Sequence, residues 1–176
     1  MRIEYGKLCI RNAQGLQDAA QLACWWNDGA VMAHAGFPNG LNTTPEWIEK
    51  EIYFDTDDTR RRLIIERDGV PIGECSYRNC FDGNAEIGIK ICESSEQEKG
   101  YGRVLLSMLI GELFRMDFKK IILDTNLNNL RAQHVYEKLG FIKTAVHIDS
   151  WKNQVGELQS AVDYELLPEN FINFAL

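Results

Sequence analysis

The residues best suited to chemistry lie in a polar loop that joins an expected strand to an expected helix. The loop runs from Glu93 to Lys99, and Gly100-Tyr101-Gly102 follows it. Glycine allows a tight turn and puts no Cβ in the way of a ligand. At a helix N-terminus the backbone N–H groups point outward and the helix dipole favours negative charge. The stretch indicates either a phosphate or pyrophosphate site or a simple strand-to-helix turn, because Gly-x-Gly alone is a weak signal.

The loop differs from the two common nucleotide-binding patterns. It contains no Gly-Lys-Ser/Thr, which argues against a P-loop. The third glycine of the dinucleotide fingerprint is missing, and no acidic ribose partner follows at the usual offset. A nucleotide-binding protein is therefore the function class that the sequence favours least.

Hydrophobic periodicity predicts the strands and helices that position this loop. Strands are expected at 8–11, 62–66, 70–77, 85–92, 120–125, 141–151 and 161–167, and helices at 16–26, 45–54, 101–116 and 130–139. Because a helix joins the strand at 85–92 to the strand at 120–125, these two strands should be parallel. Gly88, in mid-strand, indicates a bulge or the close approach of a ligand. The connection at 30–42, which holds His34, is either an ordinary loop or part of a substrate pocket.

Composition excludes several function classes. The chain has 176 residues and a net charge of −7, which fits one domain, residues 1–176, and argues against binding to nucleic acid or an anionic membrane. The same charge mildly favours cationic substrates. No apolar run approaches the ~20 residues that span a bilayer, and the N-terminus has no signal-peptide pattern. Five scattered cysteines without Cys-x-x-Cys indicate reduced thiols and a cytoplasmic protein, and the three histidines have no metal-ligand spacing, so no metal is expected.

A second motif lies between Asn129 and Phe141. Asn129, Ala132 and Tyr136 have the spacing i, i+3 and i+7, which places them on one face of a helix. Together with Gln97-x-x-Gly100-x-Gly102, this motif resembles the GCN-related N-acetyltransferase (GNAT) superfamily. The resemblance covers most of the chain, because both motifs occupy the family's positions in the order of strands and helices. By overall layout the chain is similar to the subgroup that includes ribosomal-protein and spermidine acetyltransferases.

The resemblance implies a mixed α/β fold. Its sheet would be central, twisted and mostly antiparallel, with about seven strands, a parallel and splayed pair at the centre, and flanking helices. It also implies an acetyl-CoA site between the splayed strands, with no metal. The residues implied to bind acetyl-CoA are Ile91, Cys92, Gln97, Glu98, Lys99, Gly100, Tyr101, Gly102, Arg103, Asn129 and Ala132.

The resemblance also implies catalytic roles. Tyr136 matches the position that protonates the leaving thiolate, although a core tyrosine bonded to a carbonyl is the alternative. Glu86 is the first candidate for the base that takes the amine proton and Asp124 the second, and either could instead be a solvated charge or an ion-pair partner. Cys92 near the thioester would suit an acyl-cysteine intermediate, but no histidine stands beside it to activate the thiol.

These features lead to an expected enzyme. It would transfer an acetyl group from acetyl-CoA to a primary amine, directly, in a ternary complex. The alternative is a noncatalytic acyl-CoA-binding sensor on the same fold. The acceptor would be a small molecule or a protein N-terminus, with no nucleic acid or membrane partner. The resemblance is compatible with a homodimer, which the aromatic segment at 171–174 could support.

Overall fold

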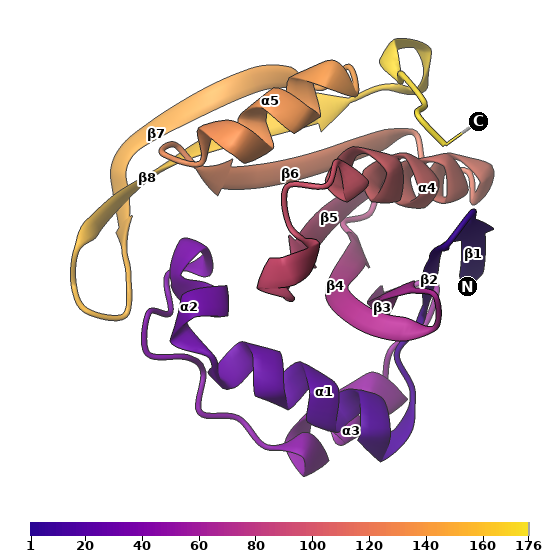
Figure 1. The fold of residues 1–176 in the computed structure, drawn as a ribbon. Helices are drawn as coiled ribbons and strands as arrows, with labels where there is room; N and C mark the ends of the chain where they lie inside the picture. The colour runs from indigo at the N-terminus through magenta and orange to yellow at the C-terminus, as the bar shows by residue number, and fades with distance from the viewer. Residues whose placement is uncertain (176) are drawn as a thin grey trace.

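The chain is organised around a twisted sheet with the strand order β1-β2-β3-β4-β5-β6-β8-β7, and the computed structural model describes residues 1–175 (Figure 1). The strands are β1 (Arg2–Tyr5), β2 (Leu8–Asn12), β3 (Arg60–Arg67), β4 (Val70–Asn79), β5 (Asn84–Ile91), β6 (Lys120–Asn126), β7 (Ile142–Lys152) and β8 (Leu158–Leu166). The helices are α1 (Gly15–Asn27), α2 (Gly29–Met32), α3 (Pro45–Tyr53), α4 (Tyr101–Arg115) and α5 (Leu130–Lys138), with 3-10 turns η1 (Ala33–Ala35), η2 (Ser94–Glu96) and η3 (Pro168–Asn170).

The fold class expected from the sequence is confirmed. Across residues 1–175 the sheet has eight strands, and β5–β6 is its one parallel pair. The strand missing from the prediction is β1, which pairs with β2 through a turn at Gly6. Its four residues, Arg-Ile-Glu-Tyr, do alternate polar and apolar, but the run is too short to distinguish a strand from chance and most of it is exposed.

The expected connection at 30–42 also contains structure that the sequence did not reveal. It begins with α2 and η1 rather than with a loop. Asp28 caps α2, because its side chain accepts a hydrogen bond of 2.8 Å from the N–H of Ala30. With only four residues, α2 is too short to show helical periodicity.

The parallel pair is short. Pairing between β5 and β6 covers Asn84–Lys120, Ala85–Ile121 and Glu86–Ile122. Beyond these pairs β6 continues against β8 as far as Asn126–Ala161, and β5 continues against β4 as far as Ile91–Gly73. The two central strands therefore diverge, as the family resemblance implied.

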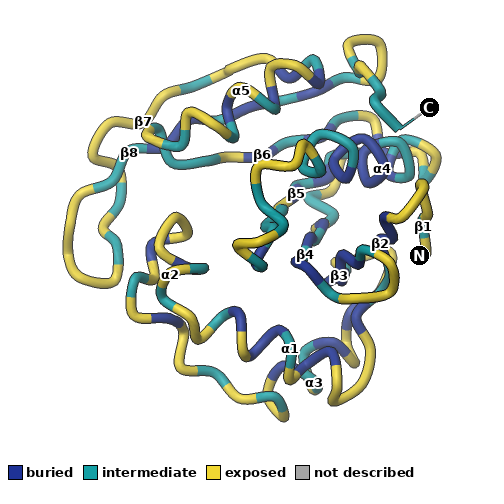
Figure 2. The backbone as a smooth tube through the Cα atoms, viewed as in Figure 1, coloured by how far each residue is buried: buried dark blue, intermediate teal, exposed yellow. Residues whose placement is uncertain are grey.

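Helices cover both faces of the sheet (Figure 1). On one face, Leu105 and Leu109 of α4 pack in a core that includes Ile121 of β6. On the other, Leu22 of α1 and Ile48 of α3 pack in a second core. Figure 2 shows buried positions alternating with exposed ones along α1, whereas the β7–β8 hairpin is largely exposed or intermediate. No helix within residues 1–175 is long and apolar enough to cross a bilayer.

A glycine at the end of α5 fixes the approach of the C-terminal segment. Gly140 has a φ of +96°, and a Cβ there would lie 1.9 Å from the carbonyl oxygen of Asn170. We expect Gly140→Ala to lower the free energy of unfolding by about 3 kcal/mol or more, since it combines backbone strain with a clash against main chain. Chemical denaturation measures this loss.

Gly156→Ala is the matched control. Its φ is +84°, but no described atom lies within 4 Å of the added Cβ. The variant should therefore lower the free energy of unfolding by only about 1–2 kcal/mol, the cost of a left-handed backbone conformation for a residue with a Cβ. Equal losses at the two positions would contradict the importance of the close approach at Gly140.

Candidate active site

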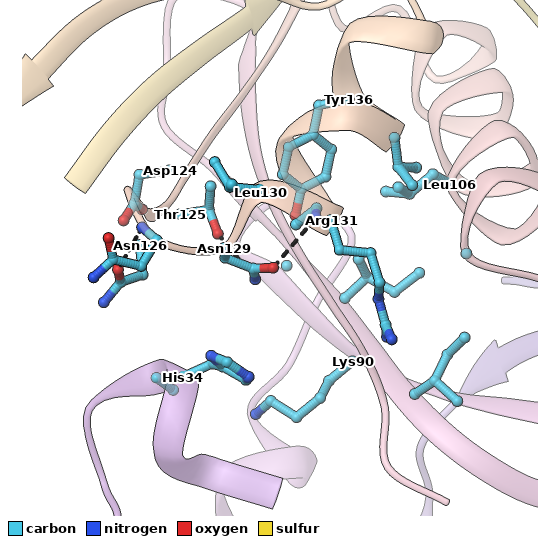
Figure 3. Close-up of a pocket in the computed structure, with 18 of the residues that line it drawn as sticks. His34, Lys90, Leu106, Asp124, Thr125, Asn126, Asn129, Leu130, Arg131 and Tyr136 are labelled. Atoms are coloured by element: carbon cyan, nitrogen blue, oxygen red, sulfur yellow. Dashed lines mark hydrogen bonds between the residues drawn. The ribbon is translucent and has the colours of Figure 1, made fainter. Parts of the chain in front are cut away.

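A cavity of about 800 Å³ opens where β5 and β6 diverge. Its walls come from β5, β6, α4, α5, the α2–η1 segment and the β7–β8 hairpin. Figure 3 shows Tyr136 and Asp124 on one side of it, with His34 and Lys90 on the other. The cavity thus joins two regions, one at the N-termini of α4 and α5 and one beneath α2.

Seven of the fourteen residues expected to be catalytic or to bind acetyl-CoA meet in this cavity. They are Ile91, Gln97, Gly102, Asp124, Asn129, Ala132 and Tyr136. The others lie outside its lining as the described residues define it: Glu86, Cys92, Glu98, Lys99, Gly100, Tyr101 and Arg103. Lining residues that the sequence did not single out include Ile89, Lys90, Asn126, Trp151 and Ala161.

The start of α4 is open toward the cavity. Gly100 is the N-cap, with a φ of +79°, and Gly102 is the second residue of the helix. An added Cβ at either glycine would meet no described protein atom within 4 Å. Free space beside a helix N-terminus suits an anionic group such as phosphate.

The charged side chains of the loop before α4 form ion pairs and hydrogen bonds within the protein. Arg67 donates to Glu96 at 2.8 Å and to the Tyr101 hydroxyl at 3.2 Å, and Lys99 pairs with the same Glu96 at 3.2 Å. Arg131 at the start of α5 reaches Glu98 at 3.2 Å. The charges of Glu98 and Lys99 are therefore paired within the protein, so the backbone rather than these side chains is the part of the loop available to a ligand.

Arg103 likewise makes its contact away from the cavity. Its guanidinium lies 4.4 Å from the centre of the Phe174 ring, in the segment that follows η3. This cation–π contact ties the first turn of α4 to the end of the described chain.

The free edge of β5 can be assigned from hydrogen-bond alternation. The N–H of Cys92 donates to the carbonyl of Ile72 at 2.9 Å, so Cys92 faces β4. Backbone groups alternate in direction along an antiparallel strand, so those of Ile87, Ile89 and Ile91 face the diverging β6. The Ile91 carbonyl already accepts from the Gln97 side chain at 2.9 Å. Ile89, two residues earlier, is therefore the backbone position most open to a ligand.

Cys92 is poorly placed both to bind acetyl-CoA, as the resemblance implied, and to form an acyl-cysteine intermediate. Its N–H is occupied, its side chain is 6% exposed, and burial raises the pKa of its thiol. A raised pKa keeps the sulfur protonated at neutral pH, which disfavours an acyl-cysteine intermediate.

Asn129 positions α5 against the cavity. It is the N-cap, and its Oδ1 accepts from the N–H of Ala132 at 3.2 Å. One side of its amide is thus used for capping, and Nδ2 lies 3.5 Å from the Thr125 hydroxyl. This arrangement places Ala132 and Tyr136 on the face of α5 that lines the cavity.

Tyr136 is buried at the ring and open at the hydroxyl. Its ring packs against Phe141 and Tyr164, each with centroids 5.7 Å away. Its hydroxyl makes no hydrogen bond within the part of the chain that the structure describes. Burial, together with the nearby Asp124 and Tyr164, raises the pKa of Tyr136 to about 12. The hydroxyl therefore stays protonated at neutral pH and is free to donate a hydrogen bond.

The two candidate bases have different surroundings. Asp124 lines the cavity and forms no ion pair with any described residue, whereas Glu86 forms an ion pair with Arg78. Surrounding protein removes part of the hydration of Asp124, and Glu86 and Asp163 add negative charge nearby, so the pKa of Asp124 is raised. Asp163, directly across from Asp124 on β8, is paired with His147 at 2.7 Å. Asp124 is therefore the carboxylate available in the cavity.

The β7–β8 hairpin and the chain after α2 close the far end of the cavity. The Gln154 N–H donates to the carbonyl of Gly36 at 2.8 Å, and the Gln154 side chain accepts from the Asn39 N–H and donates to the Gly40 carbonyl. Trp151 lies so close that a Cβ on Gly36 would fall 2.5 Å from its ring. Segments more than 100 residues apart in sequence thus form one wall.

Metal chemistry has no evident site. Among the first 175 residues, no group of three or more His, Cys, Asp or Glu side chains is arranged to hold a metal ion. The groups that meet in the cavity are instead a carboxylate, a phenolic hydroxyl and free backbone N–H groups, which suit proton transfer and stabilisation of a developing oxyanion.

Comparison with known proteins gives one family match. The model of the GNAT acetyltransferase domain matches residues 7–142. No curated protein sequence is significantly similar to the chain.

Solved structures share the fold at low sequence identity. A spermidine N-acetyltransferase from Vibrio cholerae, in complex with CoA and spermine, has a TM-score of 0.81 and 22% identity over 95% of this chain and 99% of its own. The ribosomal-protein-S5-alanine acetyltransferase from Vibrio fischeri has a TM-score of 0.81 and 17% identity over 98% and 99% of the two chains. A protein from Salmonella typhimurium with its cofactor acetyl-CoA has a TM-score of 0.75 and 24% identity over 92% and 94%.

The open space at Gly102 can be probed with coenzyme A, since one of these structures contains CoA and another acetyl-CoA. We expect Gly102→Val to weaken CoA affinity by about tenfold or more, because the side chain fills space beside the helix N-terminus. Calorimetry measures the affinity and thermal unfolding checks the fold.

Gly111→Ala serves as the control. It adds a side chain to the same helix at ordinary contact distance from Phe171, away from the cavity. Its CoA affinity should equal that of the native protein. A folded Gly102→Val with native affinity would remove the phosphate site from the start of α4.

Proposed function

The chain belongs to the GNAT acetyltransferase family, and from this premise we propose that it moves an acetyl group from acetyl-CoA to a primary amine by direct transfer in a ternary complex. One observation carries the proposal. A single cavity joins an open helix N-terminus, the free edge of β5, the Tyr136 hydroxyl and the unpaired carboxylate of Asp124. Phosphate binding, oxyanion stabilisation and proton transfer are the three tasks of this reaction.

The residues present fit acetyl-CoA, which would supply a thioester when bound. Backbone N–H groups from Glu98 to Arg103 would hold the pyrophosphate, since the first turn of α4 is open and free of Cβ atoms at Gly100 and Gly102. The N–H of Gln97 already donates to the carbonyl of Ser94 at 3.2 Å. The edge of β5 at Ile89 and Ile91 would bond the pantetheine amides. Ala132 leaves room for this arm on the cavity face of α5, beside Asn129.

The acceptor amine must lose a proton before it can attack, because an ammonium has no lone pair. Asp124 takes this proton, directly or through one water molecule. Its raised pKa makes it a stronger base than an ordinary carboxylate. The N–H groups on the free edge of β5 stabilise the carbonyl oxygen as it gains charge.

Tyr136 assists the leaving sulfur. A thiol has a pKa of roughly 8.5, and the Tyr136 hydroxyl has a pKa of about 12. Complete proton transfer from tyrosine to thiolate is therefore uphill, so the hydroxyl acts chiefly by donating a hydrogen bond as negative charge develops on sulfur.

The activity is tested by amine-dependent release of CoA from acetyl-CoA, with a panel of primary amines. Turnover with at least one amine supports the enzyme. Binding of acetyl-CoA without turnover on any amine would point to the noncatalytic sensor on the same fold.

The base assignment predicts a distinctive pH profile. We expect Asp124→Asn to lower kcat/KM by about 10²–10⁴ at neutral pH. In the native protein kcat/KM should fall as the pH drops through the raised pKa of Asp124, because the base becomes protonated there. The variant should lack this limb, and its deficit should shrink at high pH, where the amine deprotonates unaided.

Glu86→Gln is the comparison, since Glu86 is the other candidate base and also raises the pKa of Asp124. It should keep most of the maximal rate and shift the acidic limb to lower pH. If Glu86→Gln abolishes turnover while Asp124→Asn preserves it, the assignment is reversed.

The role of Tyr136 predicts a loss of rate without a loss of stability. Tyr136→Phe keeps the packed ring and removes a hydroxyl that bonds no described residue, so melting temperature and acetyl-CoA affinity should hardly change. We expect kcat to fall by ~10²-fold.

Tyr164→Phe gives the opposite pattern and serves as the control. Its hydroxyl donates to Glu137 at 3.1 Å, so its removal should cost stability, about 1 kcal/mol, with little effect on kcat. An unchanged kcat in Tyr136→Phe would show that Tyr136 is structural.

A further inference from the structure

The half of the cavity beneath α2 carries positive charge that acetyl transfer itself does not need. Lys90 of β5 and His34 of η1 both line it. Figure 3 shows the two side chains on the opposite side of the cavity from Asp124 and Tyr136. This arrangement concerns the acceptor rather than the cofactor, because the open start of α4 lies at the other end.

Lys90 keeps hydrogen-bonding capacity in the cavity. Its ammonium lies 3.0 Å from the sulfur of Met32, a weak acceptor, and forms an ion pair with Glu74 at 3.4 Å. The same Glu74 oxygen already accepts from the Trp26 ring N–H at 2.8 Å. An ammonium has three donors, and its side chain is 26% exposed, so Lys90 can still donate to a ligand.

His34 stands beside this charge without a fixed partner. No hydrogen bond to its ring is formed by any of the residues that the structure describes. It lines the same wall as Lys90 and can present a ring N–H to the same ligand atom or group.

We propose, building on the function proposed above, that the acceptor amine carries an anionic group, a carboxylate or a phosphate, which Lys90 and His34 bind. The amine end then lies toward Asp124 and the anionic end toward Lys90. Opposite charges on opposite walls orient such a molecule and bring its nitrogen to the base. A polyamine would place a second cation against Lys90, where like charges repel.

The basic side chains in this half of the cavity therefore favour a different acceptor from the one that the net charge of the whole chain favours. The net charge of −7 would favour a cationic acceptor, but two acidic side chains near Asp124 already have partners: Asp163 with His147 and Glu86 with Arg78. Asp124 alone remains for the amine, and Lys90, which pairs with Glu74 but keeps further N–H donors, faces it across the cavity (Figure 3).

Matched pairs of acceptors test the proposal. Glycine, β-alanine and 4-aminobutyrate are each compared with the corresponding amide, and phosphoethanolamine with ethanolamine, while spermidine represents the polyamines. We expect kcat/KM for an acid to exceed that of its neutral counterpart by about tenfold or more, mainly through KM. The carboxylate and phosphate series distinguish the two sources of the anion.

Lys90→Met keeps the length of the side chain and removes the charge, so the ratio of acid to neutral acceptor should fall toward one, whereas Lys90→Arg should keep it. Lys119→Met is the control, because Lys119 lies in the turn before β6 and pairs with Asp117. It should leave the ratio unchanged.

A wild-type ratio near one, a preference for spermidine, or a ratio unaffected by Lys90→Met would overturn the proposal. If no amine is acetylated, the proposed function fails, and calorimetry of the same pairs with CoA-loaded protein still decides this one. Tighter binding of the acid in the native protein but not in Lys90→Met would support it, and equal binding would overturn it.

Discussion

The early end of pairing between β5 and β6 is the constraint on which the site depends. After Glu86–Ile122 the two strands share no further register pairs in the described chain, so β5 turns away against β4 and β6 continues against β8. This divergence leaves the backbone edge at Ile89 without a strand partner and facing the cavity, where its N–H and C=O groups can bond a ligand. The cavity that opens there is bounded by the N-termini of α4 and α5, which supply the remaining free N–H groups.

Charge in the cavity is controlled by what is already paired around it. Glu86 pairs with Arg78 and Asp163 with His147, yet both carboxylates still act through space on Asp124 and raise its pKa. Asp124 itself has no ion-pair partner among residues 1–175, which leaves it available for proton transfer. On the opposite wall, Glu74 is shared between Trp26 and Lys90, which leaves Lys90 with capacity for a ligand. At both ends of the cavity, the pairing of nearby carboxylates thus determines which charged group remains available to a ligand.

Much of the fold follows from local patterns. The seven expected strands and the four longer helices are present, because each has apolar residues at its own period and turn residues at its ends. Gly140 follows α5 in a left-handed conformation, which is common for a glycine just after a helix. The elements that escaped prediction, β1 and α2, have four residues each. Segments this short are stabilised by partners and caps elsewhere in the chain rather than by a periodic pattern of their own.

The sequence by itself determined the parts of the site that depend on neighbours along the chain. The glycines at the start of α4 and the i, i+7 spacing of Asn129 and Tyr136 are local, since a helix fixes which of its residues share a face. Tertiary structure decided the rest. Glu86 and Asp124 are both carboxylates on strands of the same sheet, and only the register that pairs Arg78 with Glu86 leaves Asp124 free. The position of Lys90 against α2 likewise depends on packing between distant segments, which no spacing in the sequence encodes.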